Sequence, residues 1–231
     1  MDKDWREYHA QWEGKHWFAC AVEHAEFYSS FFRRLRRHLP PGSTVLDIGC
    51  GNGYSALWFA SLGYGVTGID TDCPAVEEAG EWARRLGLPG RFIQGDAFSF
   101  LPEERYSLSY SIGLIEHFPA EERVRLLTRQ ADFSEVVVAL APTRHSRRTV
   151  PPCSVPWTNE TVGSLRRTFR DAGLEVIEAF GVGDVYSRWD ARVKEILPRY
   201  LLRKLQDRFS YAMGAAVIGR RPATKTPDGG S

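Results

Sequence analysis

The sequence predicts an α/β fold with a doubly wound, largely parallel sheet of seven strands. Apolar, strand-like segments alternate with helix-like segments along the middle of the chain, a pattern typical of a sheet that helices cover on both faces. The first strand runs directly into a glycine-rich turn and a helix-like run, VLDIGCGNGYSALWFA at 45–60. Because ligands of such sheets bind beyond the carboxyl ends of the strands, this turn predicts a ligand site.

The expected elements follow one another in regular order. Gly63 ends the first helix of the series, and the next helix is opened by Pro74 and closed near Gly87, since proline suits a first turn and glycine a stop. The unbroken apolar run at 135–142 fits a strand buried on both faces. Strands are expected at 43–49, 64–70, 91–96, 108–113, 135–142, 174–180 and 211–219, and helices at 54–62, 74–87 and 158–172.

Two segments lie outside this alternation. The first 40 residues are helix-like and aromatic, and residues 183–210 form a basic, amphipathic insertion that Pro198 interrupts. We therefore expect one domain over 1–220, with 1–40 as an N-terminal helical lid and 221–231 as a disordered tail. Core packing, a cap over the ligand site and a dimer contact are all compatible with the insertion, so the chain is expected to be a monomer or a homodimer.

Composition excludes several classes of function. The 231 residues carry a formal charge of +1, which argues against a nucleic-acid partner. The four cysteines lie far apart with no CxxC pair, so neither a metal site nor a disulfide framework is indicated. No uncharged apolar run approaches the roughly 18 residues of a membrane span. We expect a cytoplasmic protein with no membrane partner.

The glycine turn has the wrong spacing for a dinucleotide site. In GCGNG the third glycine, Gly53, comes one residue earlier than in GxGxxG. Over roughly residues 40–180 the chain instead resembles the class I S-adenosylmethionine-dependent methyltransferases, in four regions that occur in the family's order. These regions are DIGCGNG at 47–53, GID at 68–70, GDA at 95–97 and SIGLIEHF at 111–118.

The resemblance implies a Rossmann-like methyltransferase sheet whose last strand is antiparallel, and S-adenosyl-L-methionine as cofactor. It implies that Asp47 supports the loop and the cofactor's amino group, and that Asp70 accepts hydrogen bonds from both ribose hydroxyls. Asp96 would accept from the adenine amino group, and the Ala97 amide would donate to the ring. The cofactor-binding residues expected are Asp47, Gly49, Cys50, Gly51, Gly53, Asp70, Thr71, Asp96, Ala97, Ser111 and Ile112.

The reaction that the resemblance implies is in-line methyl transfer to an O, N or S nucleophile. Methyltransferases of nucleic-acid amino groups usually carry an Asn or Asp followed by two prolines after the fourth strand, and protein arginine methyltransferases a pair of glutamates; this chain has SIGLIEHF there. A small-molecule acceptor therefore remains. His117 is the first candidate for a general base, with Glu116 beside it and His145 and Tyr8 in reserve.

Two segments supply candidate substrate-binding residues. Trp12, His16 and Trp17 lie in the aromatic leading segment, where a lid would hold a flat or cationic substrate, although the same aromatics would also dock an amphipathic helix on the sheet. Arg144 lies in a basic loop over 141–157 that would receive an anionic group, or would simply be solvated.

Two other functions stay open at this stage. A regulatory or accessory protein that binds the cofactor without methyl transfer of its own would keep the same cofactor residues. Aminopropyl transfer would need a carboxylate-rich polyamine site, and Glu116 is the one carboxylate close to the end of the fourth strand.

Overall fold

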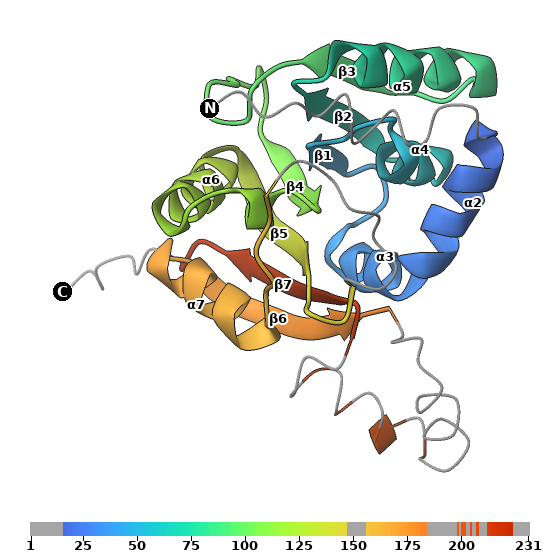
Figure 1. Ribbon diagram of the computed structural model, residues 1–231. Coiled ribbons are helices and arrows are strands. Elements are labelled where there is room, and N and C mark those ends of the chain that lie inside the picture. The colour runs from blue at the N-terminus through green and yellow to red at the C-terminus, as the bar shows by residue number, and fades with distance from the viewer. Residues whose placement is uncertain are drawn as a thin grey trace, which may run out of the picture.

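The computed structural model describes residues 16–146, 156–183, 198, 200, 201, 204, 207 and 212–223. It confirms the predicted α/β fold, a seven-stranded sheet in the order β3-β2-β1-β4-β5-β7-β6 (Figure 1). Strands β1 to β5 pair in parallel, whereas β7 is antiparallel to both β5 and β6, as expected. The strands are β1 (Thr44–Ile48), β2 (Gly65–Asp70), β3 (Arg91–Gln94), β4 (Tyr106–Ile112), β5 (Ser134–Pro142), β6 (Glu175–Val182) and β7 (Gly214–Arg220).

Helices cover both faces of the sheet. In Figure 1, α2, α3 and α4 lie on one side of the strands, and α6 and α7 lie on the other. The α-helices are α2 (Trp17–Phe27), α3 (Ser29–Leu35), α4 (Tyr54–Ser61), α5 (Cys73–Leu86), α6 (Ala120–Phe133) and α7 (Val162–Asp171). Two short 3₁₀ helices are η1 (Arg36–His38) and η2 (Ile115–His117).

Part of the leading segment, helix α3, belongs to the hydrophobic core. Phe31 and Phe32 of α3 are completely buried and belong to the same apolar cluster as Phe59 of α4 and Tyr110 of β4. Burying such a side chain contributes about 1.5–3 kcal/mol, so α3 is held on the sheet mainly by these rings. For residues 27–32, packing on the sheet is therefore the correct interpretation of the aromatic pattern.

Two predicted boundaries are wrong by three residues or more, and one helix was not predicted. Helix α7 begins at Val162 and not at Thr158, because the Thr158 amide and hydroxyl both donate to the Glu116 carbonyl and Thr161 caps the helix. Strand β7 begins at Gly214 rather than 211. Helix α6 was not expected, although Pro119 followed by two glutamates is a helix-start signal.

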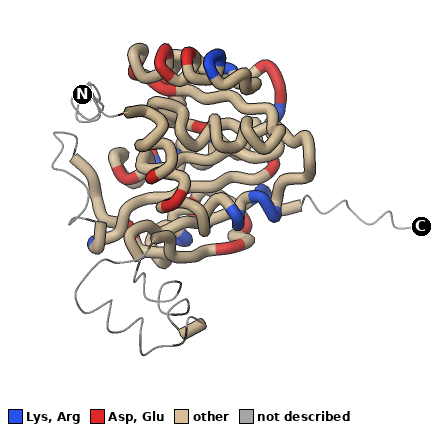
Figure 2. The backbone as a smooth tube through the Cα atoms, turned by 90° about the vertical axis from the view of Figure 1, so that its right-hand side faces the viewer, with Lys and Arg blue, Asp and Glu red and all other residues tan. Residues whose placement is uncertain are grey.

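Several expectations lie outside the described residues. They concern residues 1–15, most of the insertion at 183–210 and most of the tail at 221–231, so the lid, the insertion's role and the domain limits stay predictions. Figure 2 shows acidic and basic positions interspersed along the described chain on the side that faces the viewer. None of the helices in the described part combines the length and apolarity that a membrane crossing requires.

Candidate functional site

The glycine turn between β1 and α4 is fastened to the end of β2. The Gly49 and Cys50 amides both donate to the Ile69 carbonyl, at 2.8 and 3.0 Å, and the Gly53 amide donates to the Cys50 carbonyl at 3.0 Å. These bonds satisfy the backbone donors of a turn that reverses within five residues. The turn therefore lies at the carboxyl ends of two neighbouring parallel strands, where ligands of such sheets bind.

Asp70 holds this turn with its side chain. Its Oδ2 accepts from the Gly51 amide at 2.8 Å, and its Oδ1 accepts from the Asp72 amide at 3.0 Å. An ionised carboxylate has about four acceptor positions, so one on each oxygen remains after these two bonds. Two acceptors on one half-buried side chain suit the vicinal hydroxyls of a ribose, the role that the sequence predicted for Asp70.

Two positions in the turn require glycine. Gly49 and Gly53 have φ angles of 74° and 78°, which residues with a Cβ rarely adopt. A Cβ on Gly53 would lie 2.7 Å from the Ala79 Cβ, and one on Gly49 would lie 3.3 Å from the Leu114 side chain. The turn thus packs closely against α5 on one side and against the segment that follows β4 on the other.

Asp47 lies beneath the turn, buried in the sheet. It is 3% exposed, it faces Tyr110 across the β1–β4 ladder, and its Oδ2 accepts from the Tyr110 hydroxyl at 2.7 Å. Burial raises the pKa of Asp47 to about 7, and the Asp70 charge adds to that rise, while the bonds from Tyr110 and from the Ala56 amide oppose it. Asp47 is therefore bonded to the neighbouring strand β4, and its expected support of the loop and of the cofactor's amino group stays a prediction. Neither Tyr110 nor Ala56 was identified from the sequence, since both look like ordinary core residues.

Trp17 holds the turn from outside. Its Nε1 donates to the Asn52 carbonyl at 3.3 Å, and its ring stacks on Trp82 at 4.5 Å and tilts against Tyr54 at 5.3 Å. The ring is 7% exposed. These contacts place Trp17 against the glycine turn, and its expected contact with the substrate stays a prediction. His16 is exposed at the start of α2, and Trp12 lies outside the described residues.

The other predicted cofactor residues flank the same edge of the sheet. Asp96 closes a turn, with its Oδ1 accepting from the Phe98 amide at 2.7 Å, and the Thr71 carbonyl accepts from the Gln94 side chain at 3.3 Å. Ala97 and Ile112 are half-buried, and Ser111 and Cys50 are buried. Burial raises the pKa of the Cys50 thiol, so it stays protonated at neutral pH.

Glu116 and His117 end the segment that follows β4, at the same edge of the sheet. The His117 Nδ1 lies 2.9 Å from the Pro156 carbonyl, and its Nε2 lies 3.8 Å from the Oε1 of the buried Glu116. A carbonyl oxygen only accepts, so Nδ1 carries the proton of this hydrogen bond. In the neutral ring the lone pair then belongs to Nε2.

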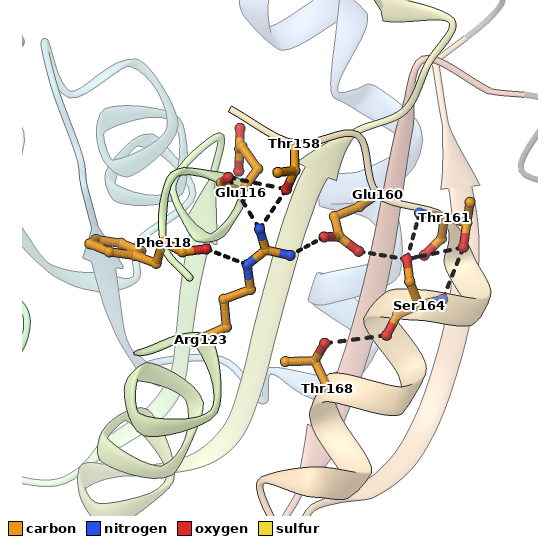
Figure 3. A network of polar contacts seen from close by, with 8 residues as sticks. All are labelled: Glu116, Phe118, Arg123, Thr158, Glu160, Thr161, Ser164 and Thr168. Carbon is orange, nitrogen blue, oxygen red and sulfur yellow. Dashed lines mark hydrogen bonds and ion pairs between the residues drawn. The ribbon is translucent and has the colours of Figure 1, made fainter. Parts of the chain in front are cut away.

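A polar network holds this segment in place (Figure 3). Arg123 of α6 pairs with the buried Glu160 and donates to the Phe118 carbonyl at 2.7 Å and to the Glu116 carbonyl at 3.4 Å. Thr158 also accepts from Arg123. One half-buried guanidinium therefore joins η2, α6 and the chain before α7, and no pattern in the sequence predicts it.

The remaining candidates are less closely integrated. Arg144 is exposed, and its Nε donates to the His145 Nε2 at 3.4 Å, so the two side chains contact each other after β5. Tyr8 lies outside the described residues. Within the described part of the chain, no three His, Cys, Asp or Glu side chains are grouped to hold a metal ion.

Comparison with known proteins identifies a methyltransferase domain in the central region of the chain. Residues 45–134 match the family model described as a methyltransferase domain. The chain is 36% identical over 84 residues to the ribosomal protein L11 methyltransferase of Thermus thermophilus, covering 36% of this chain and 33% of that protein. It is 30% identical over 136 residues to an S-adenosyl-L-methionine-dependent Diels-Alderase of Talaromyces variabilis, covering 54% of this chain and 47% of that protein.

The chain thus spans between a third and a half of the length of these two relatives. Among solved structures, magnesium protoporphyrin IX methyltransferase from Synechocystis PCC 6803 with bound S-adenosylhomocysteine superposes with a TM-score of 0.62. That likeness covers 87% of this chain and 84% of the other at 18% identity, and it shows a shared fold.

Replacing Gly53 by alanine tests the tight turn. We expect Gly53→Ala to lower the free energy of unfolding by about 2–4 kcal/mol, because left-handed backbone strain and the clash with Ala79 add together. Gly63→Ala is the matched control, since Gly63 has a φ of 85° but open space around its Cβ, and it should lose only about 1–2 kcal/mol. Urea unfolding measures both. Equal losses would contradict close packing at Gly53.

The buried Asp47 predicts a pH dependence of stability. Its pKa is raised from the ordinary value of 3.8 to about 7 in the folded protein, so between these values the unfolded chain is ionised while the folded one keeps the proton. The contribution of Asp47 to stability therefore falls as pH rises from about 4 to 7, by up to about 4 kcal/mol. The variant Asp47→Asn has no carboxyl group at this position, so its stability should not fall with pH for this reason.

Urea unfolding at pH 4 to 8 tests this prediction. The variant should gain stability relative to the unmodified protein up to about pH 7, and the difference should stay constant above it. Parallel pH curves for the two proteins would show that Asp47 titrates normally.

Proposed function

The chain belongs to the class I S-adenosylmethionine-dependent methyltransferases, and on that premise we propose that it methylates an O, N or S nucleophile of a small molecule. The main support for the proposal is that the segment after β4 contacts the glycine turn between β1 and α4. Leu114, three residues before His117, lies against Gly49 of the cofactor turn, so the segment SIGLIEHF borders the place where the cofactor is expected.

The residues of the turn fit this cofactor. The turn lies at the carboxyl ends of β1 and β2, and Asp70 retains an acceptor on each oxygen for the ribose hydroxyls. Asp96 uses Oδ1 in its turn and retains Oδ2 for the adenine amino group. In this proposal the remaining backbone contacts come from Cys50, Thr71, Ala97, Ser111 and Ile112.

When bound, S-adenosylmethionine supplies an activated methyl group, so the protein's own residues need only place the acceptor in line and remove its proton. His117 is suited to the second task, because the Pro156 carbonyl keeps the proton on Nδ1 and leaves Nε2 as the basic nitrogen. The proton of the acceptor passes to Nε2. The Glu116 carboxylate, 3.8 Å away, then stabilises the imidazolium that forms.

A small-molecule acceptor is supported by the residues after β4. SIGLIEHF lacks both the Asn/Asp-Pro-Pro pattern of nucleic-acid amino methyltransferases and a second glutamate, and the chain's formal charge is +1. Arg144 and the exposed His16 are the described side chains that we propose face the acceptor. Trp12 and Tyr8 remain proposals from the sequence.

A second candidate is cofactor-dependent action without methyl transfer. The similarity to a protein named as an S-adenosyl-L-methionine-dependent Diels-Alderase favours it. That similarity covers 54% of this chain, whereas the similarity to the ribosomal protein L11 methyltransferase covers 36%. The two candidates differ in one observable. Methyl transfer produces S-adenosylhomocysteine in proportion to product, whereas the alternative leaves the cofactor unchanged.

Asp70→Asn tests the placement of the ribose. The new amide replaces one acceptor oxygen by a donor that faces a backbone N–H, so both the turn and the ribose lose a partner. We expect S-adenosylhomocysteine to bind about 10–100-fold more weakly, measured by calorimetry. Asp132→Asn, an exposed carboxylate on α6, is the control. Unchanged affinity in Asp70→Asn would remove Asp70 from the cofactor site.

His117→Asn tests the general base. Asparagine keeps a donor for the Pro156 carbonyl but has no basic nitrogen, so kcat should fall about 10²–10⁴-fold while the affinity for S-adenosylhomocysteine stays the same. The assay follows S-adenosylhomocysteine released from S-adenosylmethionine with a panel of small nucleophiles. His38→Asn, at the end of η1, controls for loss of a histidine. An unaltered kcat in His117→Asn would exclude this role.

A further inference from the structure

Arg123 of α6 holds the backbone on both sides of His117. Its Nε donates to the Phe118 carbonyl at 2.7 Å, and its Nη2 donates to the Glu116 carbonyl at 3.4 Å (Figure 3). The guanidinium is planar, so its donors keep a fixed spacing and direction. The two carbonyls, and the histidine between them, therefore follow the position of one side chain.

The same guanidinium holds residues 156–160, the chain before α7, which we call the strap. Arg123 pairs with Glu160 of the strap, which is 4% exposed, and donates to the Thr158 Oγ1. The Thr158 amide and hydroxyl themselves donate to the Glu116 carbonyl, at 3.2 and 3.3 Å. Arg123 thus joins the strap to the segment that carries His117.

The strap in turn contacts the imidazole. The Pro156 carbonyl lies 2.9 Å from the His117 Nδ1 and accepts a hydrogen bond from it, which leaves the lone pair of the neutral ring on Nε2. Pro156 is two residues from Thr158, where Arg123 and the Glu116 carbonyl hold the strap. The network therefore sets the distance between the Pro156 carbonyl and the ring, and with it the tautomer of His117.

Arg123 acts through these groups and not on a ligand. An arginine has five N–H donors, and in the described structure four are used, one by the Phe118 carbonyl, one by Glu160, one by the Glu116 carbonyl and one by Thr158. A lysine at this position would keep the positive charge beside Glu160 but would present its donors from a single nitrogen, so it could not span the same acceptors. Replacing arginine by lysine therefore separates the charge of the residue from its geometry.

We propose that Arg123 is a positioning residue for His117. By fastening the strap to η2, it holds the Pro156 carbonyl on Nδ1 and leaves Nε2 to take the proton of the methyl acceptor. The effect on the tautomer does not depend on the proposed function. The effect on the rate rests on it, because the lone pair of Nε2 matters for turnover only if His117 is the base.

Histidine ¹⁵N spectra of the full chain test the effect on the tautomer without cofactor. The signals of His117 are assigned as those that His117→Asn removes. In the unmodified protein the neutral ring should carry its proton on Nδ1, and in Arg123→Lys both nitrogens should share it, because Pro156 is no longer held in place. Thr158→Val is a milder second variant, which lacks only the hydroxyl that bonds Arg123 and Glu116, and it should shift the tautomer in the same direction.

Arg129→Lys is the matched control. Arg129 lies on the same helix, is also half-buried, and donates to the carbonyl of Phe100, between β3 and β4, at 2.9 Å. The variant therefore loses a comparable bond between a guanidinium and a carbonyl without a change at the strap. It should leave the His117 tautomer as it is in the unmodified protein.

Kinetics test the effect on the rate. Arg123→Lys should lower kcat about 10–100-fold, because a small misplacement of a reacting group is enough for such a loss, while KM and the affinity for S-adenosylhomocysteine stay the same. In the His117→Asn background the same change should have no further effect on kcat, since the ring that Arg123 positions is absent. A residue that only stabilised the fold would lower kcat equally in both backgrounds.

Each outcome decides the proposal. A proton on Nε2 in the unmodified protein, an unchanged tautomer in both Arg123→Lys and Thr158→Val, or an equal loss of kcat with and without His117 would overturn it. If Arg123→Lys does not fold, Thr158→Val gives both measurements. A shifted tautomer in a protein that releases no S-adenosylhomocysteine with any acceptor would support the positioning of the ring and contradict the proposed function.

Discussion

The attachment of the first glycine turn to the end of β2 is the contact on which the rest of the site depends. Three successive amides, from Gly49 to Gly51, are satisfied by one carbonyl and one carboxylate of β2. These bonds pair backbone donors that the turn does not pair within itself, so they fix the turn at the end of β2. Helix α5 and the segment after β4 then pack against the turn, where a Cβ on Gly53 would clash with Ala79 and a Cβ on Gly49 would press on the Leu114 side chain.

Asp47 shows that this arrangement carries an energetic cost. A carboxyl group buried in the sheet would be more stable as an apolar residue of similar size, since desolvation outweighs what one phenol and one amide return. Its presence is consistent with a role for charge at this point, next to the cofactor turn. The neighbouring Asp70, which shares the turn, remains half-buried and makes its two bonds at the sheet edge, where solvation limits the cost.

The sequence predicted the sheet, the glycine turn and Asp70 because their causes are local. An apolar run, a glycine that admits positive φ and an acid at a strand end can each be recognised within a few residues. Tyr110 and Arg123 were not predicted because their partners Asp47 and Glu160 are 63 and 37 residues away, and only the folded sheet brings them together. The start of α7 was misplaced for the same reason, since Thr158 is held extended by Glu116, 42 residues earlier.

The two halves of the site are built by different kinds of contact. Backbone amides and glycines with positive φ shape the glycine turn, so its motif can be recognised in the sequence. Side-chain bonds shape the segment after β4, where Arg123 joins Glu160 and the carbonyls around η2. This network fixes the segment after β4 relative to α6 and to the chain before α7. The two kinds of contact meet where Leu114 lies against Gly49, so the positions of the glycine turn and of the segment after β4 depend on each other.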